Sequence, residues 1–551
     1  MFCDRERGWS KTVFSVPLGR TETTAMPKKI NITGTCYPAL HYMADISAKL
    51  KAIMTMVEEG EYFTINRPRQ YGKTTMLATL NDTLSARADY LPIRMNFQGV
   101  DSKHHETDSA FAQMVLRQMR DFLEHQDRAL FDAIQDRSAE VEGMDDLSRL
   151  ITYMAHQSKK KLVLLIDEVD ASSNYWPFLR FLGMLRSKYL DRFSPQNATF
   201  YSVVLAGVHD VKSLKSKIRA GEDNVDQYNS PWNIAADFKV TMSLQPEEIV
   251  PMLEDFAQKQ GVQLDAPYLA ERLYYYTSGY PFLVSKLCKI MSEELLPARE
   301  GKALAEADLE QAVQQLMQED NTNFESLIKN LENNPELYNL AFQVIINGVN
   351  IPFNPDEPVT ALGRLYGIFK SNGRLRIHNR IYEQRLYSYM TAKYFREQLS
   401  KEQEVSPGLY TTADGQGLDL ERALLRFQQY LREQYSKRDE HFLERHWRLV
   451  FLAFLKPIIN GKGHDFKKVQ ISEEKRLDVV VTYHQQKYII ELKRWYGEEA
   501  HQRGLLQLAD YLQRQGMDKG YLLIFDPRRQ GDAPAHGWQE VEGKRVFVVW
   551  V

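Results

Sequence analysis

The alternation of apolar and polar positions divides the chain into strand-like and helix-like segments. From residue 27 to about 245, short apolar runs alternate with stretches of helical periodicity, which predicts a doubly wound α/β domain. The run KLVLLIDE is apolar almost throughout, as is typical of a parallel strand buried on both faces. We expect a long helix from about 109 to 136 and further strands at EYFTIN, LPIRMNF, ATFYSVVLAG and FKVTMSL.

Beyond residue 245 the pattern changes twice. A purely helical stretch with charged faces is followed by a short helix and two apolar runs around Asn372-Gly373, a dipeptide that strongly favours a hairpin. Helix followed by hairpin suggests a winged-helix module. The predicted division is an N-terminal arm at 1–26, an α/β core at 27–245, a helical lid at 246–330, a winged-helix-like module at 331–398, a polar linker at 399–419 and a last α/β unit at 420–551.

Composition narrows the class of protein. The 551 residues carry a formal net charge of −3, so the total charge neither favours nor excludes a nucleic-acid partner. The three cysteines lie far apart and provide neither a disulfide framework nor a zinc-ligand spacing. Every apolar run is shorter than the ~18 residues of a membrane span. These features predict a cytoplasmic protein without a membrane partner, and Met26 is expected to lie near the start of the folded part.

The segment NRPRQYGKTTML, residues 66–77, has the character of a phosphate-binding loop. It lies between a predicted strand and a predicted helix, where backbone N–H groups at a helix N-terminus hold phosphate oxygens. Lys73 follows Gly72 and is placed to reach the β- and γ-phosphates, and the Thr74 hydroxyl is placed to bind Mg²⁺. The first glycine of the usual pattern is replaced by Arg67.

A second acidic segment follows about ninety residues later and completes the nucleotide site. The strand KLVLLIDEVD ends in Asp167 and Glu168. An aspartate at this position holds the Mg²⁺ shell, and the glutamate beside it polarises the attacking water. Together the two segments predict ATP and Mg²⁺ as cofactors, with Thr74 and Asp167 as metal ligands and Glu168 as the catalytic group.

These two segments resemble bacterial AAA-like ATPases whose phosphate loop begins with a Pro-Arg pair. The resemblance covers about 27–398 and implies that Arg67 is a family feature. It also implies that the nucleotide is held by the loop residues Arg67, Pro68, Arg69, Gln70, Tyr71, Gly72, Lys73, Thr74 and Thr75 together with Asp167. TSGYPFLVSKL resembles the Gly-x-Pro lid motif of related ATPases. His209 or Asp210 is a candidate nucleotide sensor and Arg219 a candidate arginine finger, while solvated loop residues remain the alternative.

The segment RLDVVVTYHQQKYIIELKRW, residues 476–495, predicts a second active site. Asp478 begins one predicted strand, and Glu491 and Lys493 lie two apart on the next, so they share a face. Two carboxylates bind Mg²⁺ ions that activate water for phosphodiester hydrolysis, and a lysine offsets the charge that develops on the phosphate. The alternative is an amphipathic strand pair with surface ion pairs.

This segment resembles the core of the PD-(D/E)XK nuclease superfamily, a restriction-endonuclease-like α/β fold, over about 420–551. The resemblance assigns metal binding to Asp478 and Glu491 and catalysis to these two together with Lys493. An upstream helix places Glu444 as the first acidic residue. Gln507 and Tyr511, four apart on a downstream helix, resemble the substrate-placing pair of the exonuclease-like branch.

The leading functional hypothesis is an ATPase coupled to a metal-dependent nuclease. Its partner is nucleic acid, DNA above RNA, with defence against phage or mobile elements as a role and a homo-oligomer as a compatible state. The alternative is a nucleotide-switch protein that binds DNA or another partner and carries a catalytically silent nuclease fold. For the winged-helix-like module, contacts with duplex phosphates are predicted for Arg364, Lys370, Arg374, Arg376 and Arg380, a solvated basic wing being the alternative.

Overall fold

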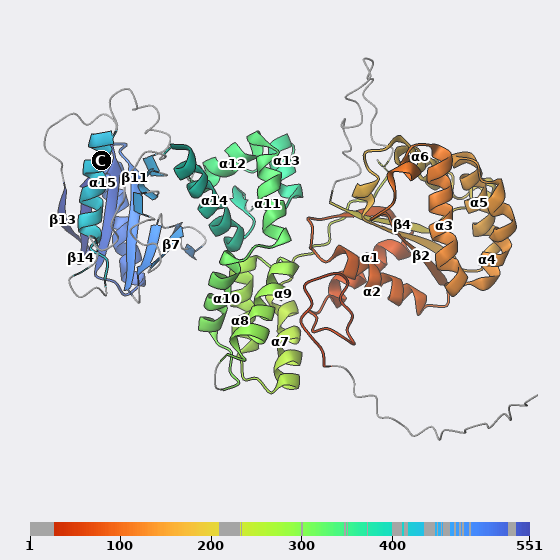
Figure 1. Cartoon of the computed structure of the whole chain (residues 1–551), viewed down its shortest axis with the longest axis horizontal. Coiled ribbons are helices and arrows are strands. Elements are labelled where there is room, and N and C mark those ends of the chain that lie inside the picture. The colour runs from red at the N-terminus through yellow and green to blue at the C-terminus, as the bar shows by residue number, and fades with distance from the viewer. Residues whose placement is uncertain are drawn as a thin grey trace, which may run out of the picture.

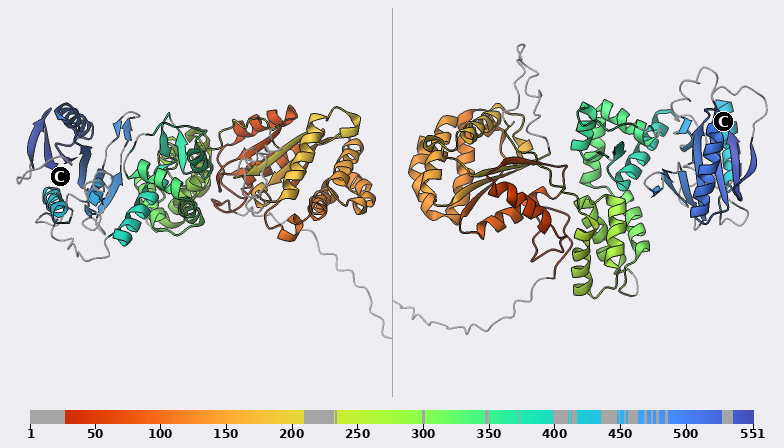
Figure 2. Two further views of the ribbon diagram at one scale, coloured as in Figure 1. Left: turned by 90° about the horizontal axis from the view of Figure 1, so that it is seen from above. Right: turned by 180° about the vertical axis from the view of Figure 1, so that it is seen from behind.

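Two α/β units lie at opposite ends of the molecule, with helical units between them (Figure 1). Views from above and behind show the same succession (Figure 2). This computed structural model describes residues 27–208, 232, 234–298, 301–346, 349, 351–371, 373–398, 410, 412, 417–434, 447–448, 450–452, 454–455, 463–467, 470–472, 475–476, 479–483, 486–526 and 536–551. Within these residues, no helix combines the length and the hydropathy that a bilayer span requires.

The first unit is a parallel four-stranded sheet covered by helices on both faces. Its strand order is β1-β4-β3-β2. The strands are β1 (Tyr62–Asn66), β2 (Tyr90–Asn96), β3 (Lys161–Asp167) and β4 (Ser202–Gly207). The helices are α1 (Ser47–Glu58), α2 (Lys73–Ser85), α3 (Asp108–Gln126), α4 (Arg128–Gln135), α5 (Met144–Gln157) and α6 (Trp176–Leu190).

Burial explains why the sheet forms where the apolar runs stand. All of β4, and all of β3 except its first residue, are buried, as the continuous apolar pattern predicted. One face packs on α3, α5 and α6 through a core that includes Phe111, Ile151 and Phe178. The other face packs on α1 and α2, with Ile53 and Leu77 in a core that continues into the helical units.

Two predictions about this unit need correction. The long helix expected from 109 to 136 is two helices, because the Asp127 carboxylate accepts the N–H of Leu130 and starts a new helix there. The expected strand FKVTMSL is irregular. It approaches β1 through a single bridge between Phe63 and Ala236.

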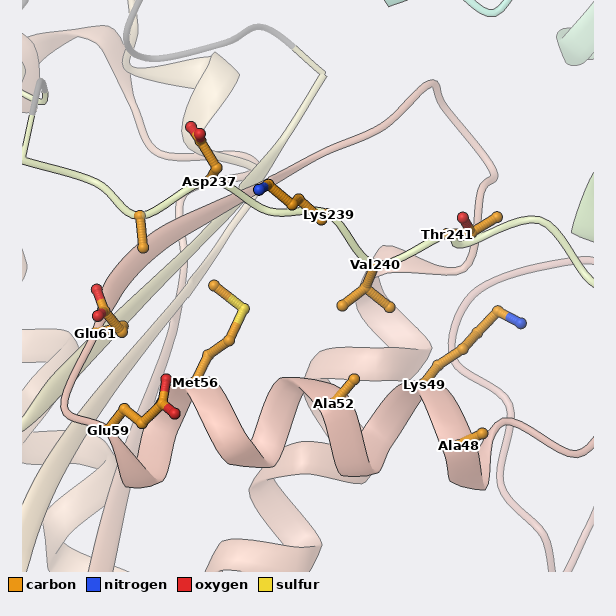
Figure 3. Close-up of a pocket in the computed structure, with 11 residues that line it drawn as sticks. Ala48, Lys49, Ala52, Met56, Glu59, Glu61, Asp237, Lys239, Val240 and Thr241 are labelled. Carbon is orange, nitrogen blue, oxygen red and sulfur yellow. The ribbon is translucent and has the colours of Figure 1, made fainter. Parts of the chain in front are cut away.

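The backbone groups of this irregular segment find other partners, which is why no ladder forms. The Val240 carbonyl accepts a hydrogen bond from the Arg67 guanidinium, and the Leu244 N–H donates to the Gly279 carbonyl. A groove of about 740 Å³ remains between the segment and α1. Figure 3 shows Val240 turned toward α1 and Asp237 turned away from it.

The middle of the chain forms two helical units. The lower one in Figure 1 contains α7 (Pro246–Gln260), α8 (Ala266–Thr277), α9 (Pro281–Ile290) and α10 (Glu306–Gln318). The upper one contains α11 (Thr322–Glu332), α12 (Pro335–Ile345), α13 (Pro358–Leu365), the hairpin of β5 (Phe369–Ser371) and β6 (Leu375–Ile377), and α14 (Arg380–Gln398). The helix and hairpin therefore occur where the sequence predicted them.

The last unit is a mixed six-stranded sheet of order β13-β14-β12-β11-β10-β7. Its helix α17 packs on one face through Leu505, Leu508 and Leu512. The elements are α15 (Leu420–Gln434), β7 (Gly463–Lys467), β10 (Val479–Tyr483), β11 (Gln486–Arg494), α17 (Glu498–Arg514), β12 (Lys519–Phe525), β13 (His536–Val541) and β14 (Lys544–Trp550), with a separate small pair β8 (Gln470–Ser472) and β9 (Lys475–Arg476).

Gly279 at the turn between α8 and α9 provides a test of how the lid attaches to the core. Its φ is +70°, and a Cβ there would stand 2.0 Å from the Leu244 carbonyl oxygen. We expect Gly279→Ala to destabilise the protein by about 3 kcal/mol, through backbone strain and a clash that no side-chain rotation relieves. Thermal unfolding measures this.

The matched control is Gly261→Ala at the end of α7. Gly261 has a similar φ of +65°, but nothing lies within 4 Å of a Cβ placed there. The control should therefore lose only about 1 kcal/mol, the left-handed conformational term. Equal losses in the two variants would show that the Leu244 contact is unimportant.

Candidate functional site

The phosphate loop connects β1 to α2 at the carboxyl edge of the parallel sheet. Gly72 has φ +80°, and nothing lies within 4 Å of a Cβ built on it. It precedes α2 without a capping side chain, so the first N–H groups of the helix lack the usual intramolecular acceptor. A glycine here leaves the helix N-terminus open to the phosphate oxygens of a ligand.

Lys73 is buried just inside the loop. Its Nζ donates to the carbonyl oxygens of Arg67 and Pro68, at 3.0 Å each. Burial lowers the pKa of Lys73, and the nearby carboxylates, Glu168 first among them, act in the opposite direction. The ammonium group thus lies between the loop and the acidic end of β3.

Asp167 and Glu168 stand where β3 ends. Asp167 is fully buried, and its Oδ1 accepts the N–H of Glu168 at 3.0 Å. Its Oδ2 is buried and has no hydrogen-bond partner, an arrangement that is unfavourable unless another group completes it. A divalent cation is such a group, so the donor set fits Mg²⁺.

Glu168 adopts a backbone conformation that few non-glycine residues use. Its φ is +53°, which directs the chain sharply after β3. Burial raises the pKa of Glu168, and the Lys73 ammonium partly offsets this. A carboxylate with a raised pKa is better suited to accept a proton from water.

One pocket of about 480 Å³ connects these groups, a volume suited to a nucleotide. Besides loop residues and Glu168, its lining includes side chains that the sequence interpretation missed. They come from an N-terminal strap at 31–46, from the 242–244 segment and from the lid: Asn31, Ile32, Tyr42, Ile46, Met242, Leu244, Met252, Pro281 and Phe282. The Gly-x-Pro motif was the available signal for Pro281, whereas the strap carries no recognisable motif.

Arg67 points away from this pocket. Its guanidinium donates to the carbonyls of Asn66 and Val240, at 2.8 and 2.7 Å, and lies 5.1 Å from the centre of the Phe238 ring. An arginine is therefore compatible with the position of the usual glycine, since its side chain extends behind the loop.

The remaining loop residues are anchored by later parts of the chain. Gln70, with φ +56°, accepts a hydrogen bond from Asn323 at 3.0 Å. Pro68 packs against Gly367, and the carbonyl of the exposed Arg69 accepts the Tyr280 hydroxyl.

Two further residues complete this anchoring. The buried Tyr71 hydroxyl lies 2.8 Å from Ser243 Oγ and 3.1 Å from His378 Nε2. Thr74 lines the nucleotide pocket, and the Thr75 hydroxyl accepts the N–H of Cys36 in the strap.

The second candidate centre lies on β11 and α17. Glu491 and Lys493 share a face of β11, as predicted, and form an ion pair with Nζ and Oε1 2.7 Å apart. Glu491 is buried and Lys493 is half-exposed. Gly504 of α17 lies over the lysine, where a Cβ would be 3.5 Å from Lys493 Cε.

The predicted pair on α17 divides into a buried and an exposed member. Tyr511 is buried, and burial raises its pKa, with additions from Tyr275 and Glu491. Gln507, one turn earlier, is exposed. Glu444 and Asp478 lie outside the described residues, as do His209, Asp210 and Arg219. Within the described part of the chain, no three His, Cys, Asp or Glu side chains gather in a way that could hold a metal ion.

The basic residues of the hairpin unit do not face one surface together. Lys370 donates to Ser278 Oγ at 2.6 Å, and Arg380 stacks 4.5 Å from the Tyr275 ring centre. Arg364 lines a pocket behind the phosphate loop, whereas Arg374 is exposed. The expectation of a single duplex-facing cluster is therefore wrong, since three of the five residues face other parts of this chain.

The position of Arg67 generates a test. Arg67→Gly restores the usual glycine, yet it leaves the Val240 carbonyl without its charged donor. We expect a loss of about 2 kcal/mol in stability and no gain in ATP affinity. Thermal unfolding and nucleotide titration measure both. Arg69→Gly adds the same backbone freedom two positions later but removes an exposed side chain, so it should be milder; tighter ATP binding by Arg67→Gly would contradict this account.

Comparison with known proteins places this architecture in a family. A family model described as an AAA-like domain matches residues 38–387. No curated protein matches the chain. Similar solved structures include a Walker-type ATPase of Pyrococcus abyssi, 12% identical over 65% of this chain and 99% of that one, with a TM-score of 0.44. The RuvB Holliday junction branch migration motor of Thermotoga maritima is 13% identical over 65% and 95%, with a TM-score of 0.31.

The family model spans more than half of the chain, from the N-terminal strap through the phosphate loop and the lid to α14. This chain therefore belongs to the AAA-like domain family of P-loop ATPases.

Proposed function

We propose that this protein hydrolyses ATP in the 480 Å³ pocket and uses the nucleotide cycle to control a C-terminal nuclease-type centre that acts on DNA. The observation that carries the ATPase part is the convergence of three features on one pocket. They are the uncapped start of α2 at Gly72, the buried Lys73 ammonium, and the Asp167 carboxylate oxygen that lacks a hydrogen-bond partner.

Each residue of the pocket has a role in the proposed hydrolysis. The N–H groups after Gly72 bind phosphate oxygens, and Lys73 leaves the loop carbonyls to contact the β- and γ-phosphates. Thr74 and Asp167 would hold Mg²⁺, which neutralises charge on the phosphates. Glu168 accepts the proton of the attacking water, a role that its raised pKa supports.

The nuclease part of the proposal rests on β11. The Glu491 carboxylate would hold Mg²⁺ together with Asp478, and Lys493 would turn from Glu491 toward the scissile phosphate. We assign Glu444 as a further acidic residue and Gln507 and Tyr511 to substrate placement. In this proposal residues 246–330 are the lid, 331–398 a winged-helix module that contacts DNA, and 420–551 the nuclease domain. Defence against phage or mobile elements is a role that such a protein would suit.

One observation favours the second candidate function, a nucleotide switch with a silent nuclease fold. The Glu491 carboxylate is already neutralised by Lys493 at 2.7 Å, so both groups have a partner without metal or substrate. In this case the C-terminal unit binds DNA or another partner and cuts nothing.

The nucleotide site is tested by two substitutions. Lys73→Ala should reduce ATP turnover at least about 100-fold and weaken binding, because it removes the positive charge on the phosphates. Glu168→Gln should retain binding and lose turnover. Lys51→Ala, an exposed lysine on α1, is the matched control and should behave as wild type. Wild-type turnover in Lys73→Ala would refute the assignment.

The nuclease site is tested by cleavage of linear, single-stranded and circular DNA in Mg²⁺ or Mn²⁺, with and without ATP. Glu491→Gln and Asp478→Ala should each eliminate cleavage and leave ATP turnover unchanged. Lys493→Ala should lose most of the rate, on the order of 100-fold. Lys487→Ala, an exposed lysine on the same strand, should cut normally. Absence of cleavage by the wild-type protein would favour the switch, and normal cleavage by Asp478→Ala would show that the centre lies elsewhere.

A further inference from the structure

A second pocket lies behind the phosphate loop, on the side opposite the nucleotide pocket. Its volume is about 600 Å³, within the range of small-molecule sites. Three distant parts of the chain form it: the start of the loop, the irregular segment at 236–239 and the hairpin unit. The lining residues are Thr64, Asn66, Arg67, Pro68, Tyr71, Ala236, Asp237, Phe238, Lys239, Phe353, Arg364, Phe369, Lys370, Ser371 and His378.

The lining of this pocket is strongly basic. Four cations, Arg67, Lys239, Arg364 and Lys370, face one acidic side chain, Asp237, among the residues that line it. Burial lowers the pKa of His378 to about 3, so this histidine is neutral and adds no charge. Like charges gathered in a partly buried space repel one another, and a bound anion removes that repulsion.

The cations retain donors that a ligand could use. The printed contacts of Arg67 occupy two of its five N–H groups, both with backbone carbonyls. Burial lowers the pKa of Arg67, and the Arg364 guanidinium is close enough to lower it further. Paired guanidinium groups match the oxygens of a phosphate, which accept two parallel hydrogen bonds.

Aromatic rings provide the other half of the pocket. Phe353 and Phe369 from the hairpin unit and Phe238 from the irregular segment line it. Phe238 is held in place by stacking on Phe63, with ring centres 6.0 Å apart and planes 2° apart. Cations beside aromatic faces suit a ligand that carries both phosphate and a planar base.

We propose that this pocket is a second ligand site that binds a phosphate-bearing nucleotide unit, either a free nucleotide or one unit of a nucleic-acid strand. It is distinct from the ATP pocket and goes beyond the function proposed above. The shared chemistry is a phosphate held by Arg67, Arg364 and Lys239 with a base against the phenylalanines.

The loop between the two pockets links them physically. Tyr71 lines both, and its hydroxyl contacts His378 behind the loop. Pro68 packs against Gly367 of the hairpin unit, and its carbonyl accepts a hydrogen bond from Lys73. A ligand that moves Arg364 and the hairpin therefore changes the position of the loop that binds ATP, and binding at each site alters affinity at the other.

The test uses full-length Lys73→Ala protein, in which the ATP pocket is weakened. Isothermal titration calorimetry measures binding of two probes, pyrophosphate and a ten-nucleotide single-stranded DNA. Adding Arg364→Ala should weaken binding of at least one probe about tenfold or more, the scale of a charge-assisted hydrogen bond. Lys239→Ala, on an exposed segment, should act in the same direction and guards against a folding defect in Arg364→Ala.

The matched control is Arg117→Ala, which removes an exposed arginine on α3 outside these pockets. Binding of pyrophosphate that depends on Arg364 and Lys239 but not on Arg117 supports a free-nucleotide site. The same dependence for the oligonucleotide alone supports a strand site. If both probes bind equally to all these proteins, or bind to none, the proposal is wrong. ATP turnover of wild-type, Lys73→Ala and Glu168→Gln proteins reports separately on the ATPase.

Discussion

The contact on which the nucleotide pocket depends is the burial of Tyr71 beneath the later parts of the chain. Its hydroxyl lies between Ser243 and His378, which follow it by 172 and 307 positions. A phosphate loop with arginine in place of its first glycine has less backbone freedom to wrap a ligand by itself. Here the loop is shaped from outside, because Tyr71, Pro68 and Gln70 are each held by the helical units. The ATP site is consequently a property of the core, the lid and the hairpin unit together.

Charge is divided between the two sides of this loop. On the nucleotide side, Lys73 faces the carboxylates of Asp167 and Glu168, so the site is nearly balanced before ligand and metal arrive. On the other side, cations outnumber carboxylates among the lining residues. The first arrangement suits the binding of an anion together with a divalent cation, and the second suits an anion alone. This difference gives the two pockets different chemistry although they share Tyr71.

The two candidate catalytic centres differ in how far the described residues assemble them. At the end of β3, the Asp167 oxygen and the Glu168 carboxylate stand beside the loop in the geometry that hydrolysis requires. On β11, Glu491 and Lys493 satisfy each other. The ion pair must open before Lys493 contacts a substrate phosphate. Control of that opening is a direct way for a nucleotide cycle to regulate a C-terminal centre.

The sequence by itself determined the elements whose signal is local. The apolar run of β3, the hairpin at Asn372-Gly373, the position of Lys73 at the start of α2 and the shared face of Glu491 and Lys493 all follow from the period of strands and helices. Tertiary structure alone decided the features that depend on distant partners. The segment at 238–244 has the composition of a strand but stays irregular, because Arg67 and Gly279 take its backbone groups. Likewise, Arg364 looks like a surface cation in the sequence, yet packing brings it behind the phosphate loop, because position in space depends on contacts that no local pattern encodes.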